Sequence, residues 1–116
     1  MIIDFNTIAE TTVSCMHGGT GEITAKMYTD PQRSVTPCRI HAGGEIGLHT
    51  HETADEICYV LYGTGIALCD GAEEPLYTDV CHICPKGASH AIRNTGMTDL
   101  VLLSVTIEHK SKEATV

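Results

Sequence analysis

Short apolar segments alternate along the chain with clusters of glycine, proline, aspartate and asparagine. Each segment has about the length of a β-strand, and none repeats with the 3.6-residue period of an amphipathic helix. Asp70-Gly71 and Gly63-Thr64-Gly65 separate such segments and are typical of hairpin turns. The pattern therefore predicts an all-β fold of about eight to ten short strands in an antiparallel barrel or sandwich. The expected strands include residues 22–29, 35–42, 57–62, 66–69, 80–84, 89–94 and 100–107.

The two ends of the chain carry weaker patterns than its middle. Residues 1–15 alternate only loosely and could form a short strand or a single helical turn, in an arm that packs against a neighbouring subunit. Residues 108–116 are expected to be a solvated tail. A chain of 116 residues is expected to fold as one domain, 1–116. Its core would span about 34–107, preceded by an arm and the first strands in 1–33.

Two histidines and a carboxylate lie close together in the middle of the chain. His49 and His51 are two residues apart, so on one strand both side chains point to the same face. Glu56 follows a short turn, and a Pro-x-Gly turn at 85–87 leads into a further strand that carries His90. Three imidazoles and one carboxylate predict a site for one divalent transition metal (Mn, Fe, Ni, Co or Zn). One or two coordination positions would remain for water or a ligand.

The spacing of these residues resembles that of the cupin family. Its first motif, Gly-x5-His-x-His-x4-Glu-x6-Gly, is matched by Gly43, His49, His51, Glu56 and Gly63. Its second, Gly-x5-Pro-x-Gly-x2-His-x3-Asn, is matched by Pro85, Gly87, His90 and Asn94, with Asp79 in place of the opening glycine. The resemblance covers about residues 34–107. It implies a single-domain antiparallel β-barrel of the double-stranded β-helix or jelly-roll type, with a metal at its centre. It implies no particular reaction, because cupins include isomerases, lyases, dioxygenases, storage proteins and sensors.

Strand alternation adds candidates to the site. If Glu56 faces inward, the alternate residues of its strand face inward too, namely Cys58, Val60 and Tyr62. By the same rule Glu45 shares the face of His49.

Arg39 and His41 share one face of their strand, and that face could be inward or outward. An inward Arg39 would suit a carboxylate or phosphate ligand. Tyr62 and His41 are the candidates for a catalytic proton-transfer role.

Composition narrows the possible partners and the compartment. The net charge is -8 and the sequence pI about 5.2, which argues against a nucleic-acid or anionic-membrane partner. The first residues show neither the basic start nor the apolar run of a signal peptide. The six cysteines fall mostly within apolar segments, which favours reduced, buried thiols in the cytoplasm.

Cys81 and Cys84 form a Cys-x2-Cys pair, which is half of many zinc sites. The only candidate second pair is Cys15 with His17, and the segment resembles an ordinary apolar strand. We therefore expect no second metal site there.

The resemblance and the ligand set together favour a metal-dependent enzyme. The metal would act as a Lewis acid on a small oxygen-rich molecule such as a sugar or uronate, in an isomerase-like or tautomerase-like reaction. An Fe(II)-dependent dioxygenase and a non-enzymatic binding or sensing module are the alternatives. The expected partners are a small-molecule ligand and a second copy of the chain, because a barrel of this size leaves sheet edges open.

Overall fold

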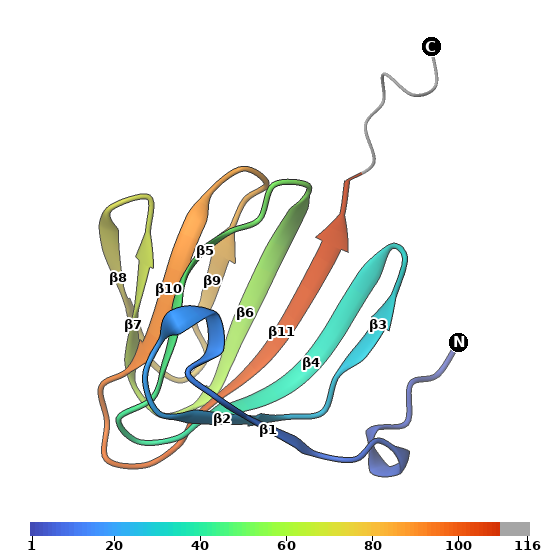
Figure 1. The fold of residues 1–116 in the computed structure, drawn as a ribbon, viewed down its shortest axis with the longest axis horizontal. Coiled ribbons are helices and arrows are strands. Elements are labelled where there is room, and N and C mark those ends of the chain that lie inside the picture. The colour runs from blue at the N-terminus through green and yellow to red at the C-terminus, as the bar shows by residue number, and fades with distance from the viewer. Residues whose placement is uncertain (110–116) are drawn as a thin grey trace.

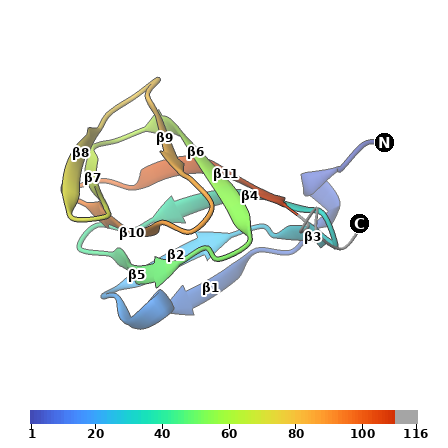
Figure 2. The ribbon, with the colours of Figure 1, turned by 90° about the horizontal axis from the view of Figure 1, so that it is seen from above.

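The computed structural model describes residues 1–109, which form two antiparallel sheets that face each other (Figures 1 and 2). The larger sheet has the order β1 (Thr11–Ser14), β2 (Glu22–Ala25), β4 (Arg33–Ile40), β11 (Leu100–Glu108), β6 (Ala54–Tyr62) and β9 (Cys81–Cys84), with β3 (Tyr28–Asp30) beside β4. The smaller sheet has the order β5 (Glu45–Thr50), β10 (Ser89–Asn94), β7 (Gly65–Cys69) and β8 (Ala72–Leu76). Two 3₁₀ turns are η1 (Phe5–Thr7) and η2 (Met16–Gly18).

This arrangement confirms the all-β, antiparallel jelly-roll prediction. The barrel is not closed, because within residues 1–109 every strand pairing lies inside one of the two sheets. The same residues include no helix that is long and apolar enough to cross a membrane.

The core lies between the two sheets and consists of aliphatic side chains and cysteines. Strand β11 crosses its middle, and Leu100 and Leu102 on its inner face are almost completely buried. Leu100 lies opposite Ile40 of β4, and Leu102 lies opposite Val60 of β6. Ile92 packs against this row from the smaller sheet. Because successive side chains of a strand point to opposite faces, these buried positions determine which residues of each strand face the space between the sheets.

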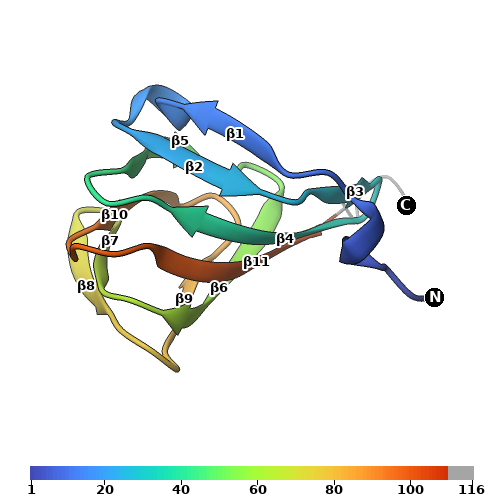
Figure 3. The ribbon, with the colours of Figure 1, turned by 90° about the horizontal axis from the view of Figure 1, so that it is seen from below.

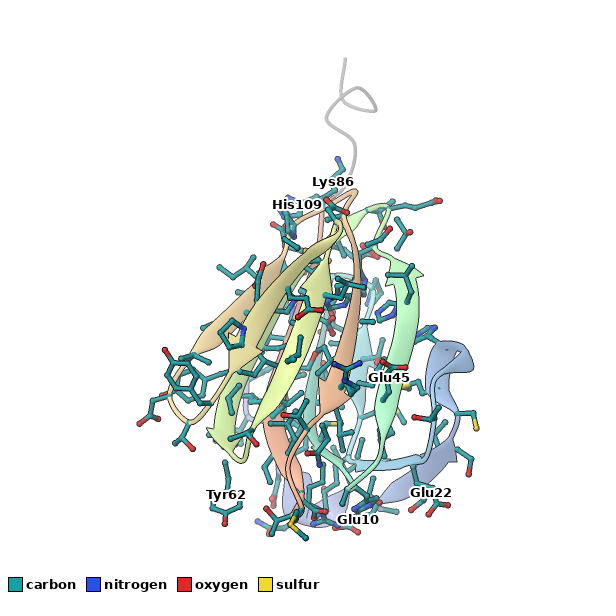
Figure 4. All side chains as sticks on the ribbon, turned by 90° about the vertical axis from the view of Figure 1, so that its left-hand side faces the viewer. Glu10, Glu22, Glu45, Tyr62, Lys86 and His109 are labelled. Carbon is teal, nitrogen blue, oxygen red and sulfur yellow. The ribbon has the colours of Figure 1, made fainter. Side chains whose placement is uncertain are left out.

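A register shift at the end of β6 reverses this alternation. Val60 pairs with Leu102, but Tyr62 pairs with Val101, so β6 contains one extra residue. Tyr62 is consequently turned to the outside, where 58% of it is exposed and it projects away from the strands (Figure 4). The prediction that Tyr62 faces inward with Glu56 is therefore wrong, whereas Cys58 and Val60 do face inward.

A second irregularity lies in β5. Ile46 pairs with Ile92 and His49 with His90, so two residues of β5 lie opposite one residue of β10. Ile46 therefore shares the inner face with His49. Glu45, expected on that face, lies instead on the outer side of the smaller sheet (Figure 4).

The N-terminal segment contains both alternatives expected for residues 1–15, since η1 is followed by β1. Figure 3 shows β1, β2 and β4 side by side in the larger sheet, and Ile23 and Ala25 of β2 belong to the core. At the other end, the expected tail 108–116 begins later, because Glu108 is still part of β11. Residues 110–116 of that tail lie outside the described residues.

Candidate metal centre

Four side chains from three strands and one turn converge between the sheets. The ligand atoms of His49, His51, Glu56 and His90 all lie within 4.8 Å of one another. His90 Nε2 is 2.7 Å from Glu56 Oε1, 3.1 Å from His49 Nε2 and 3.2 Å from His51 Nε2. His51 Nε2 is 3.1 Å from Glu56 Oε1.

These separations fit a metal with right angles between its ligands. Nitrogen and oxygen ligands bonded at about 2.1 Å lie about 3.0 Å apart along the edge of an octahedron. The measured 2.7–3.2 Å separations bracket that value. The four residues therefore fit a divalent transition metal in both ligand type and spacing.

Strand register brings the ligands together. His90 on β10 lies directly opposite His49 on β5. The Pro-x-Gly turn at 85–87 is tied to His51, since Gly87 N–H donates to the His51 carbonyl and His51 N–H donates to the Ala88 carbonyl. The turn that precedes His90 is thus hydrogen-bonded to the segment that carries His51.

Hydrogen bonds and burial shift the pKa values of three of the four residues. Burial raises the pKa of Glu56, but hydrogen bonds from His51, His90 and Ser104 outweigh burial and hold its pKa well below the usual range. The hydrogen bond to Glu56 raises the pKa of His51, whereas burial lowers the pKa of His49. The site therefore offers an ionised carboxylate, and burial favours the neutral, metal-binding form of His49.

Comparison with known proteins is consistent with this site. The model of the cupin domain matches residues 38–106. An oxalate-binding protein from Thermotoga maritima is 35% identical over 92% of this chain and 93% of its own length. This chain belongs to the cupin family. The crystal structure of a predicted oxalate decarboxylase from Thermotoga maritima has a TM-score of 0.85 at 32% identity and covers 93% of this chain and 99% of that one. A sugar phosphate isomerase from Silicibacter pomeroyi, with a TM-score of 0.73 at 19% identity, covers 93% of this chain and 76% of that one, and shares the fold.

The remaining motif residues of this cupin build its turns. Asn94 is buried and donates to the carbonyl oxygens of Ile40 and Thr98 at 2.8 Å each, which joins the end of β10 to β4. Asp79 stands where the family motif has glycine, and it adopts the left-handed conformation there with a φ of 70°. A turn therefore forms at this point although the glycine is replaced.

A cavity of about 150 Å³ opens beside the four ligands. This is the volume of roughly five liquid water molecules, so a ligand that fills it must be small. Its walls combine apolar side chains with hydroxyl groups, and the described residues that line it include no lysine or arginine. The apolar part consists mainly of Met16, Ile23, Ala25, Met27, Ile46, Ile92 and Leu102, and the hydroxyl part of Ser34, Thr36, Ser104 and Thr106.

Two cysteines in the cavity wall are neutral thiols. Burial and the nearby Glu56 carboxylate raise the pKa of Cys38 to about 12. The same two causes raise the pKa of Cys58 well above its usual value. Because a thiolate is the reactive and metal-binding form, neither residue acts as a nucleophile or ligand here.

Sequence reasoning missed His17 as a residue of the site. Its ring stacks on that of His49, with centroids 4.0 Å apart and planes inclined by 14°. Turn η2 lies against β5 (Figure 1), and a Cβ atom on Gly19 or Gly47 would collide with the backbone of the opposite segment. The glycines therefore allow the close approach that puts His17 at the cavity, a role that their sequence alone does not distinguish from an ordinary turn.

His41 and Arg39 lie outside the cavity. His41 Nδ1 is 2.9 Å from Asp99 Oδ1 and its Nε2 is 2.7 Å from Thr24 Oγ1. Arg39 forms ion pairs with Glu10 and Asp99 on the outer face of the larger sheet. Neither residue lines the cavity, and neither does Tyr62. The structure thus gives no position from which His41 or Tyr62 contacts a ligand at the metal.

The Cys-x2-Cys segment is an ordinary strand, as expected. Cys81 is exposed on the outer face of β9, while Cys84 is buried on the inner face beside Cys69 and Ala88. Their side chains point to opposite faces, so they cannot hold one metal together.

Proposed function

We propose that this cupin binds one divalent transition metal at His49, His51, Glu56 and His90, and through it a small chelating dicarboxylate such as oxalate. The observation that carries this proposal is a group of four residues placed to hold a metal, beside a small cavity whose described lining has no lysine or arginine. The oxalate-binding relative supports the choice of ligand. When bound, the metal supplies a Lewis acid that attracts carboxylate oxygens.

The arrangement of the ligand atoms favours a ligand with two oxygen donors. The metal-facing atoms of His51, Glu56 and His90 are all mutually within 3.2 Å. If these residues held a six-coordinate metal, their close grouping would leave two ligand positions free. Two free positions suit the two oxygens of a chelating carboxylate.

The charges and hydroxyl groups of the cavity suit the same ligand. A divalent metal and the Glu56 carboxylate leave one net positive charge, and no lysine or arginine of the described lining adds to it. A compact anion that contacts the metal directly is therefore favoured over an extended sugar phosphate or uronate, whose distant charge would be unpaired. Thr106 lies opposite Glu56 in register, and Thr36 lies opposite Ser104, so hydroxyl donors line the wall next to the shell.

Metal-dependent isomerisation, the first choice from the sequence, finds less support. Its proposed bases, Tyr62 and His41, lie outside the cavity, and the sugar phosphate isomerase that shares the fold is too distant to suggest a substrate. We therefore place ligand binding ahead of catalysis.

The test is a titration of Mn(II)-loaded protein with oxalate. Binding is measured by calorimetry and by the electron paramagnetic resonance spectrum of Mn(II). Oxalate is expected to bind only the loaded protein and to change the spectrum, whereas formate, with one carboxylate, binds at least about tenfold more weakly. Formate and CO₂ are measured in the same samples to detect decarboxylation. A loaded protein that ignores oxalate, or that converts a sugar substrate, would refute the proposal.

A pair of variants tests the hydroxyl wall. Thr106→Val is expected to weaken oxalate binding by about three- to tenfold, the value of a hydrogen bond, with metal affinity unchanged. Thr12→Val, on the exposed outer face, serves as the control and should leave both unchanged. Equal oxalate affinity in the two variants would remove Thr106 from the ligand site.

We also propose that the protein is a homodimer formed through the outer face of the larger sheet. Ile57 pairs with Ile83 in register, and both are exposed, at 36% and 55%. Tyr59, Leu61 and Ile107 are further exposed apolar residues of β6 and β11. Clustered apolar side chains on a sheet face are a common protein interface.

Light scattering should give a mass of twice the 12.5 kDa of the chain. The double variant Ile57→Lys/Ile83→Lys should give a monomer, because burying two charges per subunit opposes association. Leu48→Lys is the matched control, since Leu48 is exposed on the smaller sheet, and it should remain dimeric. A wild-type mass near that of one chain would contradict the proposal directly.

A reducing, cytoplasmic location is part of the same proposal. All six cysteines are free in the structure, and Cys38, Cys58, Cys69 and Cys84 are buried. Buried thiols are expected where disulfides do not form.

A further inference from the structure

A line of polar groups runs from the metal site to the protein surface through His82. His82 lies on the inner face of β9, and its side chain is completely buried. Its Nε2 is 2.9 Å from His90 Nδ1, and its Nδ1 is 2.8 Å from Glu74 Oε1. Glu74 comes from β8, the last strand of the smaller sheet, and its side chain is 46% exposed. The line therefore passes between the sheets at the side where β8 and β9 approach each other.

The carboxylate at the outer end fixes the protons along this line. An ionised Glu74 can only accept, so His82 Nδ1–H donates to it. Neutral His82 then has a lone pair on Nε2, which accepts from His90 Nδ1–H. A metal would take the place of the proton that His90 Nε2 shares with Glu56, and His90 would then bind it through the Nε2 lone pair, which faces Glu56, His49 and His51.

His49 is held in the same tautomer by a different acceptor. Its Nδ1–H donates to the carbonyl oxygen of Gly47 at 2.7 Å, which likewise leaves Nε2 facing the metal position. A backbone carbonyl oxygen accepts the Nδ1–H hydrogen bond of His49. For His90 the acceptor is the His82 ring, which is in turn bonded to the Glu74 carboxylate. An acceptor that ends in a carboxylate increases the electron density of the ligating ring and strengthens the metal bond.

We propose that His82 and Glu74 are positioning residues of the metal centre, which hold His90 in the Nδ1–H tautomer and orient its Nε2 toward the metal. This inference rests on the proposed metal binding, and it adds that metal affinity depends on a surface carboxylate through two buried rings. Neither residue is one of the positions that the motifs specify, so the motifs alone do not reveal this effect.

The test compares Co(II) affinity and the visible spectrum of bound Co(II) across four variants. His82→Phe keeps the ring volume but removes the acceptor, and should lower affinity by about 10- to 100-fold and shift the spectrum. His82→Gln retains an acceptor oxygen and should recover most of the affinity. Glu74→Gln removes the charge and should lower affinity by about threefold to tenfold. Glu73→Gln is the matched control, because Glu73 is exposed on the same strand, and should behave as wild type.

Nitrogen-15 NMR of the protein loaded with diamagnetic Zn(II) identifies the tautomers directly. His82 and His90 are both expected as Nδ1–H forms, and Glu74→Gln should shift the ring signals of His90 although the two residues are not in contact. If His82→Phe does not fold, the Co(II) affinities and spectra of Glu74→Gln and Glu73→Gln are compared instead. An Nε2–H form of His90, or wild-type affinity and spectra in Glu74→Gln and His82→Phe, would overturn the inference alone. Wild-type protein that binds no metal would overturn the proposed function and this inference with it.

Discussion

Replacing His49 and His51 together by alanine is expected to abolish metal binding at micromolar concentrations. The double variant removes two of the four ligand atoms that lie within 4.8 Å of one another, and loss of even a group that only orients a ligand costs about 10- to 100-fold in affinity. The stabilisation that metal gives to the fold should vanish too, because a metal that binds only the native state stabilises it in proportion to its binding. Elemental analysis and thermal unfolding with and without metal measure the two effects.

Cys81→Ser/Cys84→Ser is the control for that experiment. Cys81 and Cys84 lie on opposite faces of β9, so this variant should keep both its metal and the stabilisation. His90→Ala should lose metal, whereas His41→Ala should retain it, since His41 bonds Asp99 and Thr24 away from the cavity. Loss of metal from the cysteine variant with retention in the histidine variant would show that the metal lies elsewhere.

Metal affinity is expected to fall by more than tenfold between about pH 7 and pH 5. A protonated imidazole cannot coordinate, and an ordinary histidine has a pKa of about 6.5. The hydrogen bond to Glu56 raises the pKa of His51, so His51 is the first ligand for which protons compete as the pH falls. Burial lowers the pKa of His49, which therefore competes only at lower pH. Glu56 remains ionised over this pH range, so it takes up no proton when the metal leaves.

The proton uptake per metal released should thus increase from about one toward more than one as the pH decreases. Calorimetry in buffers of different ionisation enthalpy measures this number directly. Glu56→Asn removes the carboxylate that raises the pKa of His51 and should move the onset of competition to lower pH, although the metal binds more weakly. An affinity that does not change between pH 7 and pH 5 would exclude histidine ligands.

In the metal-free protein, Glu56 and His51 stabilise the fold at a lower pH than the pH that favours metal binding. The pKa of Glu56 is lowered in the fold, so its contribution to stability is present above its unfolded value of 4.5 and is lost as the pH falls through the folded value. The pKa of His51 is raised, so its contribution is present below 6.5 and is lost as the pH rises through the folded value. The Glu56–His51 pair therefore stabilises the empty site most between about pH 4.5 and 6.5, where the metal begins to be released.

The ligand set and the fold were predictable because both depend on local patterns. Turn residues and alternation identified the strands, and motif spacing identified His49, His51, Glu56 and His90. Alternation failed at Tyr62 and Glu45, because a single-residue shift in β6 and another in β5 place these two residues on the opposite face from Glu56 and His49. Such irregularities depend on how neighbouring strands pair, which a strand's own sequence does not determine.

His17 and His82 could not be assigned to the site for a related reason. His17 reaches His49 only because η2 packs on β5, and His82 reaches His90 only where β9 and β10 of different sheets meet. Alternation in β9 does place His82 on the inner face with Cys84, so a buried histidine was foreseeable, although its partner was not.

The first strands have a consequence for how proteins of this kind diversify. The family model begins at residue 38, and all four metal-binding residues follow it. Yet much of the cavity wall comes from earlier in the chain, namely Met16, His17, Ile23, Ala25, Met27, Ser34 and Thr36. The proposed metal ligands thus lie in one stretch of sequence, whereas a large part of the wall that a bound molecule would contact lies in another. Two relatives could share every motif residue and still accept different molecules, through changes in a segment that the motifs do not cover.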